Sequence, residues 1–140
     1  MSTQWNGKTC PSCSQAILES RIKKAEFEYR GRTLEYIQEG AWCPDCGEGL
    51  VTGAEAEATE SILDDFIAQV DKEEAAELVR IRKKLGLSQK EAAIIAGGGH
   101  NAFSRYERGE AKPVAAVINL FRLLDRHPDL LSELKRRKAA

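Results

Sequence analysis

Two cysteine pairs constrain the N-terminal half of this chain more than any other feature. The sequence places Cys10-Pro-Ser-Cys13 and Cys43-Pro-Asp-Cys46 on either side of a 29-residue interval. Each Cys-x-x-Cys pair forms a tight turn that presents two sulfurs to one point, and two such turns complete a tetrahedral zinc site. Four thiolates fill the coordination sphere, so no position is left for water or substrate. We therefore predict one structural zinc ion per chain, bound by Cys10, Cys13, Cys43 and Cys46.

Two other uses of paired cysteines stay open at this stage, an iron centre and redox chemistry. A thioredoxin-type pair lies where a strand meets a helix in a βαβ unit, and neither pair has that context. The interval also exceeds the spacing of about 15–20 residues that is usual between such pairs. A hairpin or a three-stranded sheet would absorb the difference. His100 and His127 lie far along the sequence, and we expect neither to bind metal.

The interval between the cysteine pairs has the pattern of a small antiparallel sheet. Phe27 and Tyr29 precede a turn at Arg30-Gly31, and Leu34, Tyr36 and Ile37 follow it. Aromatic and β-branched residues favour strands. A segment of this size buries little apolar surface, and zinc binding supplies the missing stability. Residues 1–9 are polar, and we expect them to be frayed.

The rest of the chain has helical periodicity. Ile62, Leu63, Phe66, Ile67 and Val70 recur three and four residues apart, which indicates an amphipathic connecting helix. Gly86, the capping box that starts at Ser88, the run of three glycines from Gly97, Gly109 and Pro113 then mark the ends and starts of shorter helices. The predicted helices cover residues 54–70, 72–85, 88–96, 100–108 and 129–137, with another beginning near Pro113 and turning Val117, Leu120, Leu123 and Leu124 inward.

These patterns predict an α+β protein, in which a small zinc-bound antiparallel β domain precedes an all-α domain. The predicted divisions are a zinc domain at residues 1–53, a connecting helix at 54–71 and a helix-turn-helix domain at 72–140. No apolar run reaches the ~20 residues that a membrane span requires. The N-terminus lacks the apolar core of a secretory signal, so we expect a cytoplasmic protein without a membrane partner.

The helix-turn-helix prediction depends on a short helix, a glycine turn and a second helix with polar residues at its start. Leu87, Ala92, Ile95, Phe103 and Tyr106 would lock the two helices together. Asn101 and Arg105 lie four residues apart and project from one face. Asn can bond adenine at two positions and Arg can fork onto guanine, so these two are the predicted base contacts.

Other polar residues around that face are predicted to contact phosphate or bases: Gln89, Lys90, His100, Ser104, Arg108 and Lys112. An alternative interpretation is that Asn101 only caps its helix and that Arg105 pairs with Glu107 or Glu110. The basic run from Arg82 to Lys84 is either a solvated helix face or a further phosphate contact.

The charge distribution differs between the two predicted domains. Residues 1–70 carry six basic and twelve acidic side chains, whereas residues 71–140 carry fifteen basic and ten acidic ones. A basic half suits a polyanion, and an acidic half suits a basic protein. Nothing in the sequence indicates a catalytic centre, so we do not expect an enzyme.

The chain resembles the MqsA (YgiT) family of antitoxins. The resemblance covers residues 10–135 and is carried by the cysteine pairs and by two blocks, Arg82–Ala92 and Gly97–Glu107. It implies a bacterial type II antitoxin whose zinc-bearing domain neutralises an mRNA-cleaving toxin. It also implies a dimerising helix-turn-helix domain that represses its own operon at a palindrome in double-stranded DNA, with Asn101 and Arg105 at the positions that contact bases.

Two rival functions remain at the level of sequence. A stand-alone zinc-containing transcriptional regulator shares every feature except the toxin, and a small basic protein encoded by the adjacent gene would favour the antitoxin. A thiol oxidoreductase would instead form reversible disulfides and bind no metal.

Overall fold

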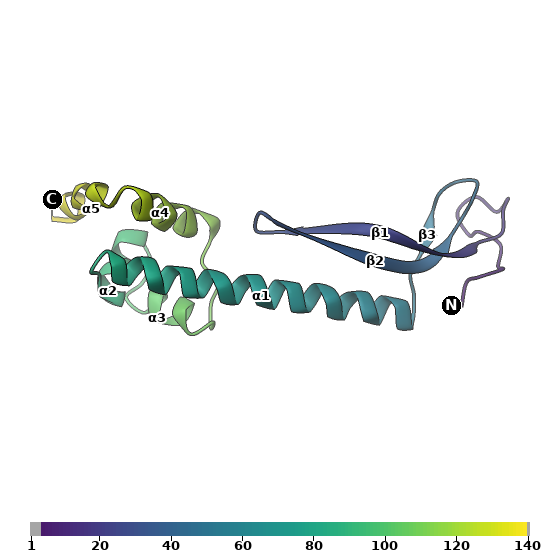
Figure 1. The fold of residues 1–140 in the computed structure, drawn as a ribbon, viewed down its shortest axis with the longest axis horizontal. Helices are drawn as coiled ribbons and strands as arrows, with labels where there is room; N and C mark the ends of the chain where they lie inside the picture. The colour runs from purple at the N-terminus through teal and green to yellow at the C-terminus, as the bar shows by residue number, and fades with distance from the viewer. Residues whose placement is uncertain (1–3, 140) are drawn as a thin grey trace. The chain divides into compact units, whose positions relative to one another are not determined.

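The computed structural model describes residues 4–139, with side chains up to residue 135. The chain forms two compact units, one that ends at Ile67 and one that begins at Ala68. The first contains a three-stranded antiparallel sheet and the start of a long helix, and the second is entirely helical (Figure 1). The predicted α+β class is confirmed.

The sheet is dominated by one long hairpin. Strands β1 (Glu19–Tyr29) and β2 (Arg32–Trp42) pair along their whole length, and the short β3 (Gly49–Leu50) pairs with the end of β2. The turn lies at Arg30-Gly31, as predicted, and both residues have positive φ, 51° and 79°. Two successive positive φ values match the twist of a two-residue hairpin, which explains why glycine stands there.

Helix α1 runs without interruption over Ala54–Lys84. The prediction of separate helices at 54–70 and 72–85 is therefore wrong. No glycine or proline occurs between residues 54 and 85, so nothing in this stretch stops a helix. Within the first unit, α1 packs on the hairpin through the rings of Phe27 and Phe66, whose centroids lie 6.1 Å apart. The Thr59 hydroxyl also donates a hydrogen bond of 2.8 Å to the side-chain oxygen of Gln38.

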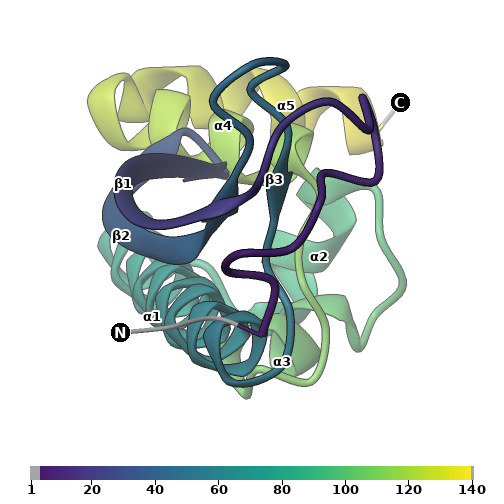
Figure 2. The ribbon, with the colours of Figure 1, turned by 90° about the vertical axis from the view of Figure 1, so that its right-hand side faces the viewer.

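The N-terminal segment is ordered from residue 4, contrary to the expected fraying. The backbone N–H of Gly7 donates to Leu18 at 2.9 Å, and that of Leu18 donates to Lys8 at 2.8 Å. Trp5 packs against a small core that includes Cys10 and Leu18. This segment and β3 lie at the same end of the hairpin (Figures 1 and 2). Residues 1–3, which belong to the same prediction, lie outside the described residues.

In the second unit, the end of α1 is followed by α2 (Gln89–Ala96), α3 (Ala102–Glu107), α4 (Ala115–Arg126), a 3-10 turn η1 (Pro128–Leu130) and α5 (Leu131–Ala139). The capping box at Ser88 is confirmed: its hydroxyl accepts from the N–H of Glu91, and the Glu91 carboxylate accepts from the N–H of Ser88. Helix α3 is shorter than predicted, and α4 begins two residues after Pro113.

The core of the second unit joins all of its helices. Phe103 of α3 and Phe121 of α4 are fully buried, with ring centroids 4.9 Å apart. Leu87 and Ala92 are buried beside them, as predicted, and Ile95 and Tyr106 pack on the same cluster. Val117 and Leu124 face inward as predicted, and Leu120 packs on the cluster. Leu123 was also predicted to face inward, but it is 43% exposed. Within residues 4–139, no helix is long and apolar enough to cross a membrane.

Candidate metal centre and nucleic-acid interface

The four cysteines meet at one end of the hairpin. Cys10 and Cys13 precede β1, whereas Cys43 and Cys46 follow β2, so the antiparallel pairing brings the two pairs together. The sulfurs of Cys10 and Cys46 lie 3.7 Å apart, as do those of Cys13 and Cys43, and all four lie within 4.8 Å of one another. A tetrahedral site with metal–sulfur bonds of about 2.3 Å has edges of about 3.8 Å. The four thiols can therefore hold a metal ion, and their sulfurs are too far apart for disulfides.

The ionisation of these thiols also fits a cation. The backbone N–H of Cys13 lowers the pKa of Cys10 and, together with that of Ser12, outweighs the effect of desolvation, so that the pKa is about 7. The backbone N–H of Glu48 favours the thiolate of Cys46 as well, but desolvation and the three neighbouring thiols together raise the pKa of Cys46 to about 12. The first thiolate forms readily and the last does not, because like charges in contact repel. A divalent ion at the centre of the four sulfurs removes that repulsion.

The second candidate site is the pair of helices α2 and α3. Gly97 ends α2 in the left-handed conformation, with φ of 80°, and its N–H donates to Ile94. The N–H of Gly98 then donates to Ala93 at 3.0 Å, and that of Ala102 donates to Gly99 at 2.9 Å. Glycine is required for the reversal at residue 97, because its lack of a Cβ removes the penalty for positive φ. The turn delivers α3 with Asn101 at its start.

Asn101 and Arg105 lie one helical turn apart, since the N–H of Arg105 donates to the Asn101 carbonyl at 3.1 Å. Both are exposed. The Asn101 side chain makes no capping hydrogen bond. The carboxylates that might have paired with Arg105 are engaged elsewhere, Glu107 with Arg82 and Glu110 with Arg108. The structure thus removes both parts of the alternative interpretation, and it leaves the amide and the guanidinium available to a ligand.

A group of polar residues that the sequence analysis did not identify fixes the end of helix α3 to its neighbouring helices. The Arg82 guanidinium donates to both oxygens of Glu107, at 2.7 and 3.0 Å, and also to the carbonyl of Leu87 at 2.9 Å. The Gln89 amide donates to the same carboxylate at 3.1 Å. These bonds connect the end of α1, the start of α2 and the end of α3. The sequence around Glu107 does not indicate this group, because its members come from three separate helices.

The remaining predicted contact residues divide into two groups. Gln89, Arg108 and Lys112 have intramolecular partners, which are Glu107, Glu110 and Asp71 respectively. Lys90 and His100 are exposed, and Ser104 is half-buried. Of the basic run, Arg82 contacts Glu107 and Lys84 contacts Asp125 at 2.8 Å, so these two have structural roles, whereas Lys83 is exposed.

Comparison with known proteins identifies relatives that match nearly the whole chain. Residues 8–135 match the family described as the antitoxin component of a bacterial toxin–antitoxin system, MqsA. The antitoxin MqsA of Escherichia coli K12 is 44% identical to this chain over 130 residues, which is 90% of this chain and 98% of that protein. The chain belongs to the MqsA antitoxin family.

As an MqsA-family member, the chain is the antitoxin of a toxin–antitoxin system, and the family implies a cognate toxin as its partner. This membership favours the antitoxin over a stand-alone regulator. It also favours a non-enzymatic regulator over a thiol oxidoreductase. The matched range includes the four cysteines as well as α2 and α3, so the family relationship extends over both candidate sites.

Proposed function

We propose that this antitoxin neutralises an mRNA-cleaving toxin through its first unit and represses its own operon through its second. The observation that supports repression is the pair Asn101 and Arg105, which are exposed and lie one helical turn apart. The Asn101 side chain does not cap the helix, and the carboxylates near Arg105 pair with other residues. Asn and Arg form the two most specific base contacts in the major groove. The protein acts in the cytoplasm, where operator DNA and messenger RNA are available.

The proposed metal is zinc, one ion per chain, with a structural role. Four thiolates are typical ligands of structural zinc, and the sulfur spacing suits a tetrahedral ion. Cys10, Cys13, Cys43 and Cys46 would hold it, and the ion would supply binding free energy to a unit whose own core is small.

DNA binding is proposed to use a helix-turn-helix dimer. Helix α3 would enter the major groove, with Lys90, His100 and Ser104 near the phosphates or base edges. Gln89, Arg108 and Lys112 would reach phosphate only by exchanging their present partners. Two copies of α3 in a homodimer would read half-sites about 34–36 Å apart on a palindromic operator.

The test is operator binding by substituted full-length protein. Arg105→Ala or Asn101→Ala should each weaken binding to a footprinted site upstream of the gene by about 1–3 kcal/mol, because each removes one two-pronged base contact. Fluorescence anisotropy at one fixed salt concentration measures the loss, with an unrelated duplex as reference.

The matched control is Arg21→Ala, which removes an exposed arginine from the hairpin and leaves α3 untouched. It should bind the operator as the wild type does. If the Arg105→Ala variant binds the operator as tightly as the Arg21→Ala control does, α3 does not contact the operator bases and the proposed repression is wrong.

A further inference from the structure

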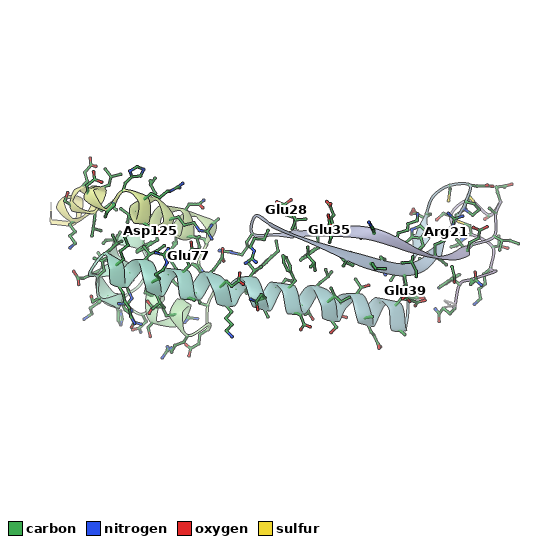
Figure 3. The ribbon with its side chains drawn as sticks, viewed as in Figure 1. Arg21, Glu28, Glu35, Glu39, Glu77 and Asp125 are labelled. Atoms are coloured by element: carbon green, nitrogen blue, oxygen red, sulfur yellow. The ribbon has the colours of Figure 1, made fainter. Side chains whose placement is uncertain are left out.

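One face of the hairpin is not covered by α1. Directly opposed residues of antiparallel strands project from the same face, and the register pairs Ile22 with Glu39, Glu26 with Glu35, and Glu28 with Thr33. The face that contacts α1 instead carries Phe27, which packs on Phe66. Glu28 and Glu35 project from the side of the hairpin turned away from α1 (Figure 3). We define the outer face by seven residues at these register positions: Ile22, Lys24, Glu26, Glu28, Glu35, Ile37 and Glu39. Glu39 lies at the edge of this face, beside the start of α1 (Figure 3).

The outer face combines exposed apolar side chains with acidic ones. Ile22 and Ile37 are each 60% exposed, although isoleucine favours burial. Four glutamates share their face, and Lys24 is the one basic residue at the register positions of this face. None of the ion pairs in residues 4–135 involves these four carboxylates. Four carboxylates against one ammonium group leave the outer face with a net negative charge.

The opposition of Glu26 and Glu35 has a cost in the isolated protein. Like charges directly opposite each other on one face of an antiparallel pair destabilise the sheet. A cation placed between the two carboxylates would convert this repulsion into attraction. The hairpin thus carries an arrangement that is unfavourable alone and favourable with a positively charged partner.

A groove of about 520 Å³ continues the outer face along β2. Ile37 and Glu39 line it from the strand, and Glu55, Thr59 and Ile62 line it from the first turns of α1. Ile62 is also exposed, at 40%. None of the residues that line the groove is basic. The groove therefore repeats the chemistry of the outer face, with apolar contact in an acidic surround.

This chemistry selects among possible occupants. A nucleic acid would be repelled by the carboxylates, because its backbone is a polyanion. A second copy of this face would bring like charges together, which disfavours self-association through it. A protein surface with Lys and Arg around an apolar contact complements both the charge and the exposed isoleucines.

We propose that the outer face and its groove are the docking surface for a basic protein, which is the cognate toxin. This inference rests on the proposed neutralisation of a toxin and specifies the residues that carry it. Glu26, Glu28 and Glu35 form the electrostatic part of the surface, and Ile22 and Ile37 form its apolar part.

The test measures binding of metal-loaded, full-length protein to the purified toxin encoded by the adjacent gene. The first variant combines Glu26→Lys, Glu28→Lys and Glu35→Lys. Its matched control combines Glu57→Lys, Glu60→Lys and Asp64→Lys, which are exposed positions on α1 with the same change in net charge. The hairpin variant should bind about a hundredfold more weakly or worse, because like-charge contacts replace complementary ones. The α1 variant should change affinity by less than about threefold.

A milder variant separates docking from folding. Glu35→Gln removes the repulsion across the strands, so it should raise the melting temperature of the isolated protein while it weakens toxin binding. Glu57→Gln should change neither. A merely structural role for Glu35 would move stability and affinity in the same direction.

The outcomes are distinguishable. If the hairpin and α1 variants lose affinity equally, or if neither does, the outer face is not the docking surface, although toxin neutralisation stands. If the wild-type protein does not bind the toxin at all, both the neutralisation and the docking surface are refuted.

Discussion

Arg82 and Arg21 each pair with a glutamate, and their different burial gives the two pairs different weight. The side chains of Arg82 and Glu107 are 14% and 8% exposed, whereas those of Arg21 and Glu19 are 54% and 52% exposed. A pair that has lost most of its water leaves an uncompensated charge when one partner is removed, but an exposed pair is replaced by water. The sequence alone could not distinguish them, because burial depends on which helices surround a side chain.

Arg82→Ala should therefore destabilise the second unit by about 3 kcal/mol, since it leaves the Glu107 carboxylate buried without its main partner. Arg21→Ala should cost less than about 1 kcal/mol. Urea denaturation followed by circular dichroism measures both. Equal effects would mean that the Arg82 pair is no more than a surface contact.

Asp125 gives the second unit a dependence on acid. Hydrogen bonds from Arg80, and next from Lys84, hold the pKa of the Asp125 carboxyl well below its ordinary value. A lowered folded-state pKa contributes stability that is present above the unfolded pKa of about 4, and that stability is lost as the pH falls through the folded value. The stability gap between the wild type and Asp125→Asn should be constant near neutral pH and should shrink below about pH 4. Melting temperatures between pH 7 and pH 2 test this, and a gap that widens in acid would contradict the assignment.

At the scale of elements, the sequence predicted the hairpin better than the helices. The turn at Arg30-Gly31 is encoded locally by two residues that adopt positive φ. The predicted division of α1 into two helices rests on the apolar periodicity of its first half, which ends at Val70, but no glycine or proline stands there to end the helix. The order of residues 4–9 was missed because it arises from contacts of Trp5 with residues distant in sequence.

The end of the sheet depends on two glycines that make room for Trp42. A Cβ at Gly49 would lie 2.7 Å from Cδ1 of the Trp42 ring and closer still to its Nε1, and a Cβ at Gly40 would lie 2.9 Å from Cη2. Lys23 lies over the ring, with its Nζ 4.7 Å from the centroid. The indole therefore lies close against the backbone of both β2 and β3.

Gly49→Ala should destabilise the first unit by about 1–3 kcal/mol, because the ring or the short strand must move. In a Trp42→Leu background, Gly49→Ala should destabilise the first unit much less. A double-mutant cycle, with unfolding followed by circular dichroism, measures this difference. Additive effects would show that the ring is not what the new methyl group meets.

At the scale of the whole molecule, the two units differ in the size of their hydrophobic cores. Among the described residues, the core of the second unit contains eleven buried residues and no cysteine. The core of the first contains four, of which two are the proposed ligands Cys10 and Cys43. Metal binding should therefore matter to one unit far more than to the other. The sequence predicts the same asymmetry, because a segment with few large apolar residues cannot bury enough surface to fold without a bound ion.

Elemental analysis should find one zinc per chain. Chelation should then unfold the first unit while the helices of the second persist. Both tryptophans, Trp5 and Trp42, lie in the first unit, so their fluorescence reports on that unit alone. Their emission should shift to the red while most of the helical signal at 222 nm remains. Loss of both signals together would show that the units do not unfold independently.

The position of the four cysteines also sets an order of events during synthesis. The last of them is Cys46, whereas α2 begins only at Gln89, so the ribosome adds more than 40 residues between the last metal ligand and the first residue of α2. At about 5–20 residues per second, that interval lasts several seconds. A nascent chain can thus acquire its metal and complete its hairpin before α2 and α3 exist. Under the proposed function, a nascent antitoxin would be able to bind its toxin while it is still too short to bind its operator.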